Sequence, residues 1–116
     1  MNDYTRTYFE EIIKAEQKLS HGAMYAVWAY QNTRDKGLND FYVSELPWEN
    51  GTAEDFVKTL REAKIEEFIT TDSSTALLRT LHELDKYGCK VAGLTTINIK
   101  VWRENEELKG IKMVLE

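Results

Sequence analysis

The chain has 116 residues, a formal net charge of −5 from 15 Lys and Arg against 20 Asp and Glu, and 42% hydrophobic residues. Such a length supplies apolar side chains for one hydrophobic core, so we expect residues 1–116 to form a single domain. No stretch approaches the ~20 apolar residues of a membrane span, and the N-terminus lacks the pattern of a signal peptide. We therefore expect a cytoplasmic protein that does not bind a membrane.

The few cysteine and histidine residues exclude several kinds of chemistry. Cys89 is the only cysteine and cannot form an intramolecular disulfide, and with His21 and His82 it is too small a set for a structural zinc site. The acidic clusters lack the spacing and turn glycine of a calcium loop. No nucleophile stands with a base and an orienting group. We predict no metal, no cofactor and no catalytic residues, which makes an enzyme the less favoured class.

Negative charge is concentrated in the middle of the chain. Residues 40–67 carry eight acidic and three basic side chains and so hold the whole excess of acidic residues. Direct binding of nucleic acid requires clustered Lys and Arg, and we expect none. Two interpretations remain: an acidic face that binds another protein with a basic face, or a solvated surface that keeps the protein in solution.

The N-terminal third is predicted to be helical. Between residues 4 and 34, apolar residues recur at three- and four-residue steps, and Gly37 follows as a stop. Ser20, His21 and Gly22 interrupt this pattern, because Ser and Gly are poor helix-interior residues. The segment is either one helix with a bent middle or two helices that meet there, and we favour one long helix.

A short strand and a second helix follow. The β-favouring run 41–43 precedes Pro47, which favours extended geometry before it, and indicates a short edge strand. Thr52 stands three residues before Asp55 in a variant of the capping box, and predicts a helix over about 53–63.

A further strand, a third helix and a hairpin complete the chain. The β-prone run 66–71 precedes three good N-cap residues, 72–74, ahead of a helix that ends at Gly88. A long strand is expected over 89–102, followed by a polar connection and a last strand over 111–115.

In the strand predicted over 89–102, apolar and polar side chains alternate. The side chains expected on one face are Val91, Thr95, Ile97, Ile99 and Val101, whereas Asn98 and Lys100 are expected on the other.

These elements predict an α/β (α+β) fold. The strand–helix–strand unit from Phe68 to Ile97 should place two parallel strands side by side, joined by a right-handed crossover. The expected architecture is a mixed sheet of three or four strands with one βαβ unit and a C-terminal β-hairpin. A long N-terminal helix and two further helices pack on this sheet.

A cluster of hydroxyl groups follows the strand around Phe68. Ligands of open α/β sheets bind beyond the carboxyl ends of strands, where helix N-termini present free N–H groups. The candidate ligand-binding residues, for a phosphate, are Thr70, Thr71, Asp72, Ser73, Ser74 and Thr75. The turn has no glycine and no lysine, and Asp72 adds negative charge. The competing interpretation, a helix N-cap with spare hydroxyls, is favoured.

Aromatic residues are abundant for a chain of this size, with three Trp, six Tyr and four Phe. In the N-terminal helix they spread over more than one face, and Tyr25, Trp28 and Tyr30 continue into its second half. A helix of about 30 residues would be roughly 45 Å long, longer than a small sheet can cover. We therefore expect Tyr25, Trp28 and Tyr30 to form an interface in a two-fold homodimer. Packing within one core is the alternative, with the helix broken at Ser20–Gly22.

Residues 48–98 resemble a family of small proteins of uncharacterised function, widespread in Gram-positive gut bacteria and often carried on plasmids or other mobile elements. The residues that carry the resemblance are Trp48, Phe56, Leu60, Arg61, the run 65–70, Ser73, Ser74, Leu77, Leu78, Leu81, the run 88–94, Ile97 and Asn98. This resemblance implies a cellular setting, and it implies no catalytic or binding residues.

Two functions are consistent with the sequence. The favoured one is a non-enzymatic interaction or regulatory module, for example a mobile-element accessory protein or an anti-defence inhibitor whose acidic face occupies a basic groove. The alternative is a small phosphate-ligand-binding enzyme with its site at the turn Thr71–Thr75.

Overall fold

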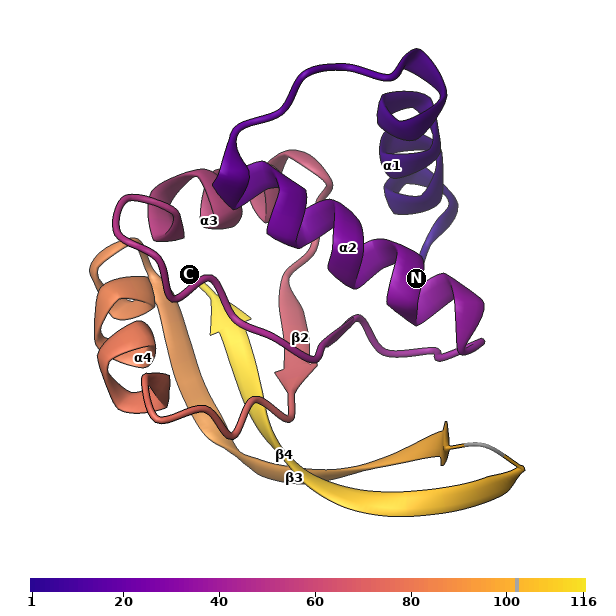
Figure 1. The fold of residues 1–116 in the computed structure, drawn as a ribbon, viewed down its shortest axis with the longest axis vertical. Coiled ribbons are helices and arrows are strands. Elements are labelled where there is room, and N and C mark those ends of the chain that lie inside the picture. Colours follow the sequence, from indigo (N-terminus) through magenta and orange to yellow (C-terminus); the bar gives the residue numbers. More distant parts are fainter. Residues whose placement is uncertain (102) are drawn as a thin grey trace.

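The computed structural model describes residues 1–101 and 103–116 (Figure 1). Its elements in chain order are α1 (Asp3–Ala15), α2 (His21–Asp35), β1 (Tyr42–Val43), α3 (Ala53–Glu62), β2 (Glu67–Thr70), α4 (Leu77–Lys86), β3 (Cys89–Val101) and β4 (Glu104–Leu115). This confirms the predicted α+β class with a mixed sheet. Trp102, predicted to end a strand, lies outside the described residues. Within those residues, no helix is both long and apolar enough to cross a membrane.

The N-terminal segment forms two helices, so the favoured prediction of one long helix is wrong. Helix α1 ends at Ala15, and the C-cap residue Glu16 has a left-handed φ of 50°. Helix α2 starts after Ser20, whose side chain accepts a hydrogen bond from the Ala23 N–H at 3.2 Å. Ser20 is thus an N-cap, the position at which serine favours a helix, whereas His21 and Gly22 lie inside α2.

The break lets α1 pack against the rest of the chain. Phe9 is fully buried and stacks on Tyr30 and Phe41, with ring centroids 4.8 and 6.0 Å apart. The Thr5 hydroxyl donates to the Ala63 carbonyl oxygen at 2.7 Å. The long projecting helix from which a homodimer was argued is therefore absent from the described chain, and the homodimer itself stays a prediction.

The sheet has the strand order β1-β2-β4-β3, with β1 parallel to β2 and β4 antiparallel to both of its neighbours. Strands β2 and β3 therefore run in the same direction, as expected for the strand–helix–strand unit. The prediction that they are neighbours is wrong, because β4 lies between them. Met113 of β4 pairs with Phe68 on one side and Val91 on the other, and it is fully buried.

Strand β4 begins at Glu104 and not near Ile111, so most of the polar segment predicted as a hairpin loop is strand. It pairs with β3 along its length, and the resulting hairpin extends well beyond β2 (Figure 1). Its outer part forms a second apolar cluster with strands β1 and β2. The buried members of this cluster are Tyr42, Ile69, Ile97 and Ile99, and the half-buried ones are Leu38 and Leu108.

The alternation predicted for β3 holds only beyond a β-bulge. Ile97 and Ile99 are buried and Asn98 is exposed, as predicted. The register shifts between Val91 and Gly93, so that Val91 opposes Met113 while Gly93 opposes the adjacent Lys112. An extra residue reverses the face of every side chain before it. Val91 therefore lies on the face of Met113, and its predicted place on the face of Ile97 is wrong. Val91 is 53% exposed on this edge strand.

Helices α3 and α4 lie where the sequence places them, but neither has the predicted cap. Thr52 makes no side-chain bond to the first turn of α3, and its hydroxyl donates to the Glu49 carbonyl oxygen instead. Helix α4 begins after Ala76, four residues beyond Asp72. The main core between the helices and the sheet contains these large buried side chains: Tyr30, Phe9, Phe56, Phe68, Leu46, Leu60, Leu84 and Met113.

Substitution of Leu84 tests the packing of α4. Leu84 is fully buried, whereas Leu78 on the same helix is 80% exposed. We expect Leu84→Ala to lower the free energy of unfolding by about 2–5 kcal/mol, and Leu78→Ala to change it by less than about 0.5 kcal/mol. Urea unfolding of both variants measures the difference. Equal losses would contradict the described packing.

Substitution of Gly22 tests the close approach of α2 to α3. A Cβ at Gly22 would clash with the Thr52 carbonyl oxygen and would lie 2.9 Å from the Asp55 Cβ. Gly→Ala inside a helix ordinarily stabilises by roughly 0.5–1 kcal/mol. Here we expect Gly22→Ala to destabilise the fold by about 1–2 kcal/mol, because overpacking costs more than the helix gains. A higher urea midpoint for the variant would show that the two helices are further apart.

Candidate functional site

The predicted phosphate-binding residues form one turn at the end of β2, and Asp72 organises that turn. Its side chain accepts hydrogen bonds from the Leu46 N–H and from the Ser74 N–H, each at 2.8 Å. Its backbone N–H donates to the Thr70 hydroxyl at 3.2 Å. The carboxylate of Asp72 is buried and connects two loops, so the interpretation of this residue as the N-cap of α4 is wrong.

The same geometry does not favour an anion at this turn. Thr70 is fully buried and Thr71 is half-buried, which leaves the hydroxyls of Ser73, Ser74 and Thr75 on the surface. A phosphate here would face the buried carboxylate of Asp72, and negative charges repel. The first turn of α4 lies beyond Ala76 and adds no N–H groups to the turn itself.

The three predicted interface residues have different environments. Tyr30 is 2% exposed, stacks on Phe9 and donates its hydroxyl to Glu10 at 2.7 Å. Tyr25 is also buried, at 5% exposure, whereas Trp28 is 46% exposed. Trp28 is thus the member of the three whose ring is available on the surface of this chain.

Trp28 belongs to a polar and aromatic cluster centred on Glu49. The Tyr25 hydroxyl donates to Glu49 Oε1 at 3.0 Å, and His21 Nδ1 lies 3.1 Å from Glu49 Oε2. The Trp28 ring contacts Tyr25 and His21 edge-on, with centroid distances of 5.5 and 6.1 Å. One carboxylate from the loop before α3 therefore orients two side chains of α2, and these in turn contact Trp28.

A second tryptophan and further carboxylates adjoin this cluster. Trp48 is 45% exposed, and its indole N–H donates to Glu45 Oε1 at 3.3 Å. The pKa of Tyr25 is raised, first by burial, then by its hydrogen bond to Glu49, and also by the charges of Glu49, Glu45 and Asp72. The hydroxyl of Tyr25 thus lies in a region of negative potential.

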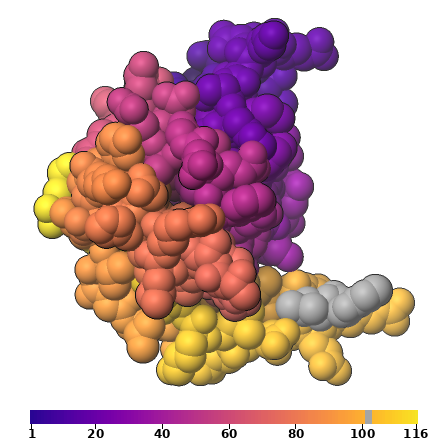
Figure 2. Space-filling view, turned by 60° about the vertical axis from the view of Figure 1, so that its left-hand side comes forward, coloured from indigo at the N-terminus to yellow at the C-terminus, as the bar shows by residue number. Residues whose placement is uncertain are grey.

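These side chains lie on α2 and on the 44–52 loop, which Glu49 joins through Tyr25 and His21. Figure 2 shows that loop, in magenta, between α2, in violet, and α4, in orange. Met24 is 36% exposed and stands one helical turn before Trp28. We call this the Trp28–Trp48 surface, and its members are His21, Met24, Tyr25, Trp28, Glu45, Trp48 and Glu49. The sequence analysis named Tyr25 and Trp28 as interface residues but did not name Trp48. The position of Trp48 inside the acidic segment 40–67 was the signal that could have identified it.

A cavity of about 130 Å³ lies next to this surface, between the loop and α4. Trp48 and Glu49 line it from the loop, and Arg79, Thr80 and Tyr87 line it from α4 and the residue after it. Thr80 is 3% exposed, and its hydroxyl has no hydrogen-bond partner among the described residues.

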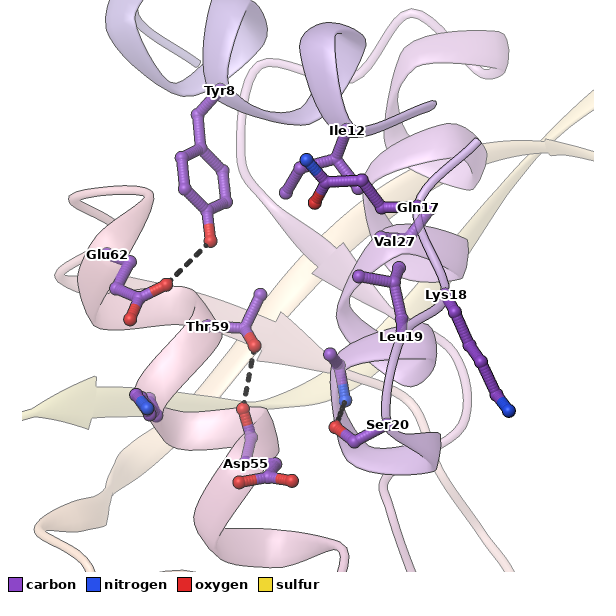
Figure 3. Close-up of a pocket in the computed structure, with 12 residues that line it drawn as sticks. Tyr8, Ile12, Gln17, Lys18, Leu19, Ser20, Val27, Asp55, Thr59 and Glu62 are labelled. Atoms are coloured by element: carbon purple, nitrogen blue, oxygen red, sulfur yellow. Dashed lines mark hydrogen bonds between the residues drawn. The ribbon is translucent and has the colours of Figure 1, made fainter. Parts of the chain in front are cut away.

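A larger cleft of about 290 Å³ separates α1 and the 16–20 linker from α2 and α3 (Figure 3). Its apolar lining includes Ile12, Leu19 and Val27. The Tyr8 hydroxyl donates to Glu62 at 2.9 Å, and burial followed by this hydrogen bond raises the pKa of Tyr8 to about 12.

The hydroxyl and charged groups of this cleft offer little chemistry. Ser20 caps α2, and the Thr59 hydroxyl donates to the Asp55 carbonyl oxygen at 2.7 Å. Lys18 and Lys58 balance the carboxylates of Asp55 and Glu62. The two hydroxyls are therefore used within the fold. The two lysines and two carboxylates leave the cleft without an excess of charge.

Cys89 and His82 do not form a catalytic pair. Cys89 is fully buried, and burial raises the pKa of its thiol to about 12, while His82 is exposed on α4. Cys89 therefore behaves as a small buried apolar residue and not as a reactive thiol. Over the described part of the chain, no group of three or more His, Cys, Asp or Glu side chains is placed to hold a metal ion.

Comparison with known proteins identifies a family. Residues 25–115 match the family described as Domain of unknown function (DUF7698), and the chain belongs to this family. The match begins inside α2 and includes Trp28 and Trp48, while α1 precedes it. No match was found among curated proteins or among solved structures. This match confirms the expectation that the chain belongs to a family of uncharacterised function.

The structural role of Asp72 can be tested by substitution. We expect Asp72→Ala to lower the free energy of unfolding by about 2 kcal/mol, because it leaves the buried N–H of Leu46 without an acceptor. Ser73→Ala is the matched control, since Ser73 is exposed, and it should change stability by less than about 0.5 kcal/mol. If thermal or urea unfolding finds Asp72→Ala as stable as the wild type, Asp72 has no structural role.

Proposed function

We propose that this protein is a non-enzymatic interaction module that binds a positively charged segment of another protein through the Trp28–Trp48 surface. The observation that carries the proposal is that two tryptophans, 46% and 45% exposed, lie close to acidic groups. Trp48 donates to Glu45, and Trp28 contacts Tyr25 and His21, which both contact Glu49. Trp, Tyr and Met are enriched in protein interfaces, and Trp is prominent among the residues that dominate binding energy.

The charge of the surface supports a basic partner. Glu45 and Glu49 are its carboxylates, and none of its members is a lysine or an arginine. Lys or Arg side chains of a partner could pair with these carboxylates and also lie over the rings of Trp28 and Trp48. Carboxylates at a surface also accelerate association with a basic partner.

The position of this surface on the fold also supports protein binding. Its anchor groups come from α2 and from a loop fixed by Asp72, so the surface is largely ordered before a partner arrives. Ordering in advance lowers the entropic cost of association. The alternative function, a phosphate-ligand-binding enzyme at Thr71–Thr75, receives less support because Asp72 is buried within that turn.

The proposal extends to the class of partner. A protein that handles nucleic acid carries a basic groove, and an acidic module could occupy that groove as an inhibitor. A role as a mobile-element accessory or anti-defence protein in the cytoplasm of Gram-positive gut bacteria is part of this proposal. A homodimer is proposed as a separate property, which light scattering would test against the chain mass of 13.5 kDa.

Binding of labelled Lys- and Arg-rich peptides, measured by fluorescence anisotropy, tests the proposal. We expect Trp28→Ala and Trp48→Ala each to weaken binding at least about 10-fold, which corresponds to about 1.4 kcal/mol. Tyr4→Ala is the matched control, because Tyr4 is 49% exposed on α1 and lies outside this surface. We expect it to bind as the wild type does.

Two outcomes would contradict the proposal. One is that basic peptides bind no better than acidic peptides of the same length. The other is that Tyr4→Ala weakens binding as much as the two tryptophan variants do.

A further inference from the structure

The cavity beside Trp48 has aromatic walls on two sides. Trp48 comes from the loop, and Tyr87 follows α4; they are 45% and 38% exposed. The cavity volume of about 130 Å³ is enough for several water molecules. Such a space suits one extended side chain.

Carboxylates outnumber cations in the lining. Glu49, Glu54 and Glu83 line the cavity together with a single cation, Arg79. Glu83 pairs with Lys86 on the same helix at 2.9 Å, and that pair lies at the surface. Among the residues that the structure describes, Glu54 has no ion-pair partner. A positive group entering the cavity would therefore meet more negative than positive charge.

The unpartnered hydroxyl of Thr80 is the second, independent observation. A buried polar atom without a partner is energetically unfavourable, and such atoms are rare in native structures. Thr80 lines the cavity, and its residue is 3% exposed. The hydroxyl oxygen itself has almost no exposed surface, so an N–H donor of a bound group would reach it only after a small rotation of the surrounding side chains.

We infer that the cavity receives a single Lys or Arg side chain of the basic segment, with the cationic head near Thr80 and Glu54 and the stem between Trp48 and Tyr87. This inference rests on the proposed function and names the feature of the partner that the cavity recognises. Aromatic rings and carboxylates together are the chemistry that holds alkylammonium and guanidinium groups. The alternative occupant of the cavity is an anion, held by Arg79 and the first turn of α3, and the experiments below test for it with inorganic phosphate.

Thr80→Val is the first test, because it removes the hydroxyl and keeps the shape. We expect it to leave the melting temperature unchanged or raised, since an unsatisfied polar atom is lost, and to weaken binding of a Lys- and Arg-rich peptide about 5- to 10-fold. Glu54→Gln should weaken binding of the same peptide and also leave the protein folded. Thr75→Val is the matched control, because Thr75 is exposed and does not line the cavity.

The indole N–H resonance of Trp48, assigned with Trp48→Phe, provides a local readout. We expect the peptide to shift it, and we expect inorganic phosphate to leave it unchanged. A shift with phosphate alone would overturn the inference in favour of an anion. A lower melting temperature for Thr80→Val would also overturn it, because the hydroxyl would then be satisfied within the fold.

The two proposals fail in different ways. If the peptide needs Trp28 and Trp48 but binds Thr80→Val and Glu54→Gln as it binds the wild type, the surface is correct and the cavity inference is wrong. If no basic peptide binds the wild-type protein, both are wrong.

Discussion

The carboxylate of Asp72 is the group on which the candidate surface depends. It accepts one hydrogen bond from Leu46, in the loop before α3, and one from Ser74, in the turn before α4. Leu46 is fully buried, so this loop enters the core immediately before Trp48. The loop and α4 are the two walls of the cavity, and a single buried side chain therefore sets their relative position.

A second set of contacts ties the same loop to α2. Gly22 allows α2 to approach the carbonyl oxygen of Thr52, and Glu49 accepts a hydrogen bond from Tyr25 and pairs with His21. Because the loop is held on both sides, Trp28 and Trp48 are presented without a large loss of conformational freedom on binding. Exposed aromatic rings on an ordered scaffold are the usual physical basis of strong interface contacts.

Local patterns predicted the elements better than their arrangement. The periodicity around α3 and the β-prone run of β2 were sufficient to place them, because those signals lie within a few residues. The insertion of β4 beside β2 depends on the pairing of Met113 with Phe68, 45 positions apart in the chain, and local patterns do not encode it. Likewise, Asp72 has the composition of a cap, but its partner Leu46 is 26 positions away. Tyr30 was predicted at an interface because one unbroken helix was favoured over the alternative, a break at Ser20–Gly22 with packing within one core, and it is α1 that stacks Phe9 on Tyr30.

The dependence of peptide affinity on ionic strength tests the central claim most directly. The affinity of the wild-type protein for a Lys- and Arg-rich peptide is measured by isothermal titration calorimetry at about 50 mM and about 500 mM salt. Charges are weakly screened at the lower concentration and strongly screened at the higher one, because the screening length falls from more than ~10 Å to a few ångströms. The account predicts clear binding at low salt and an affinity at least about 10-fold weaker at high salt. Binding of equal strength at both concentrations would show that the carboxylates of the Trp28–Trp48 surface do not select a basic partner.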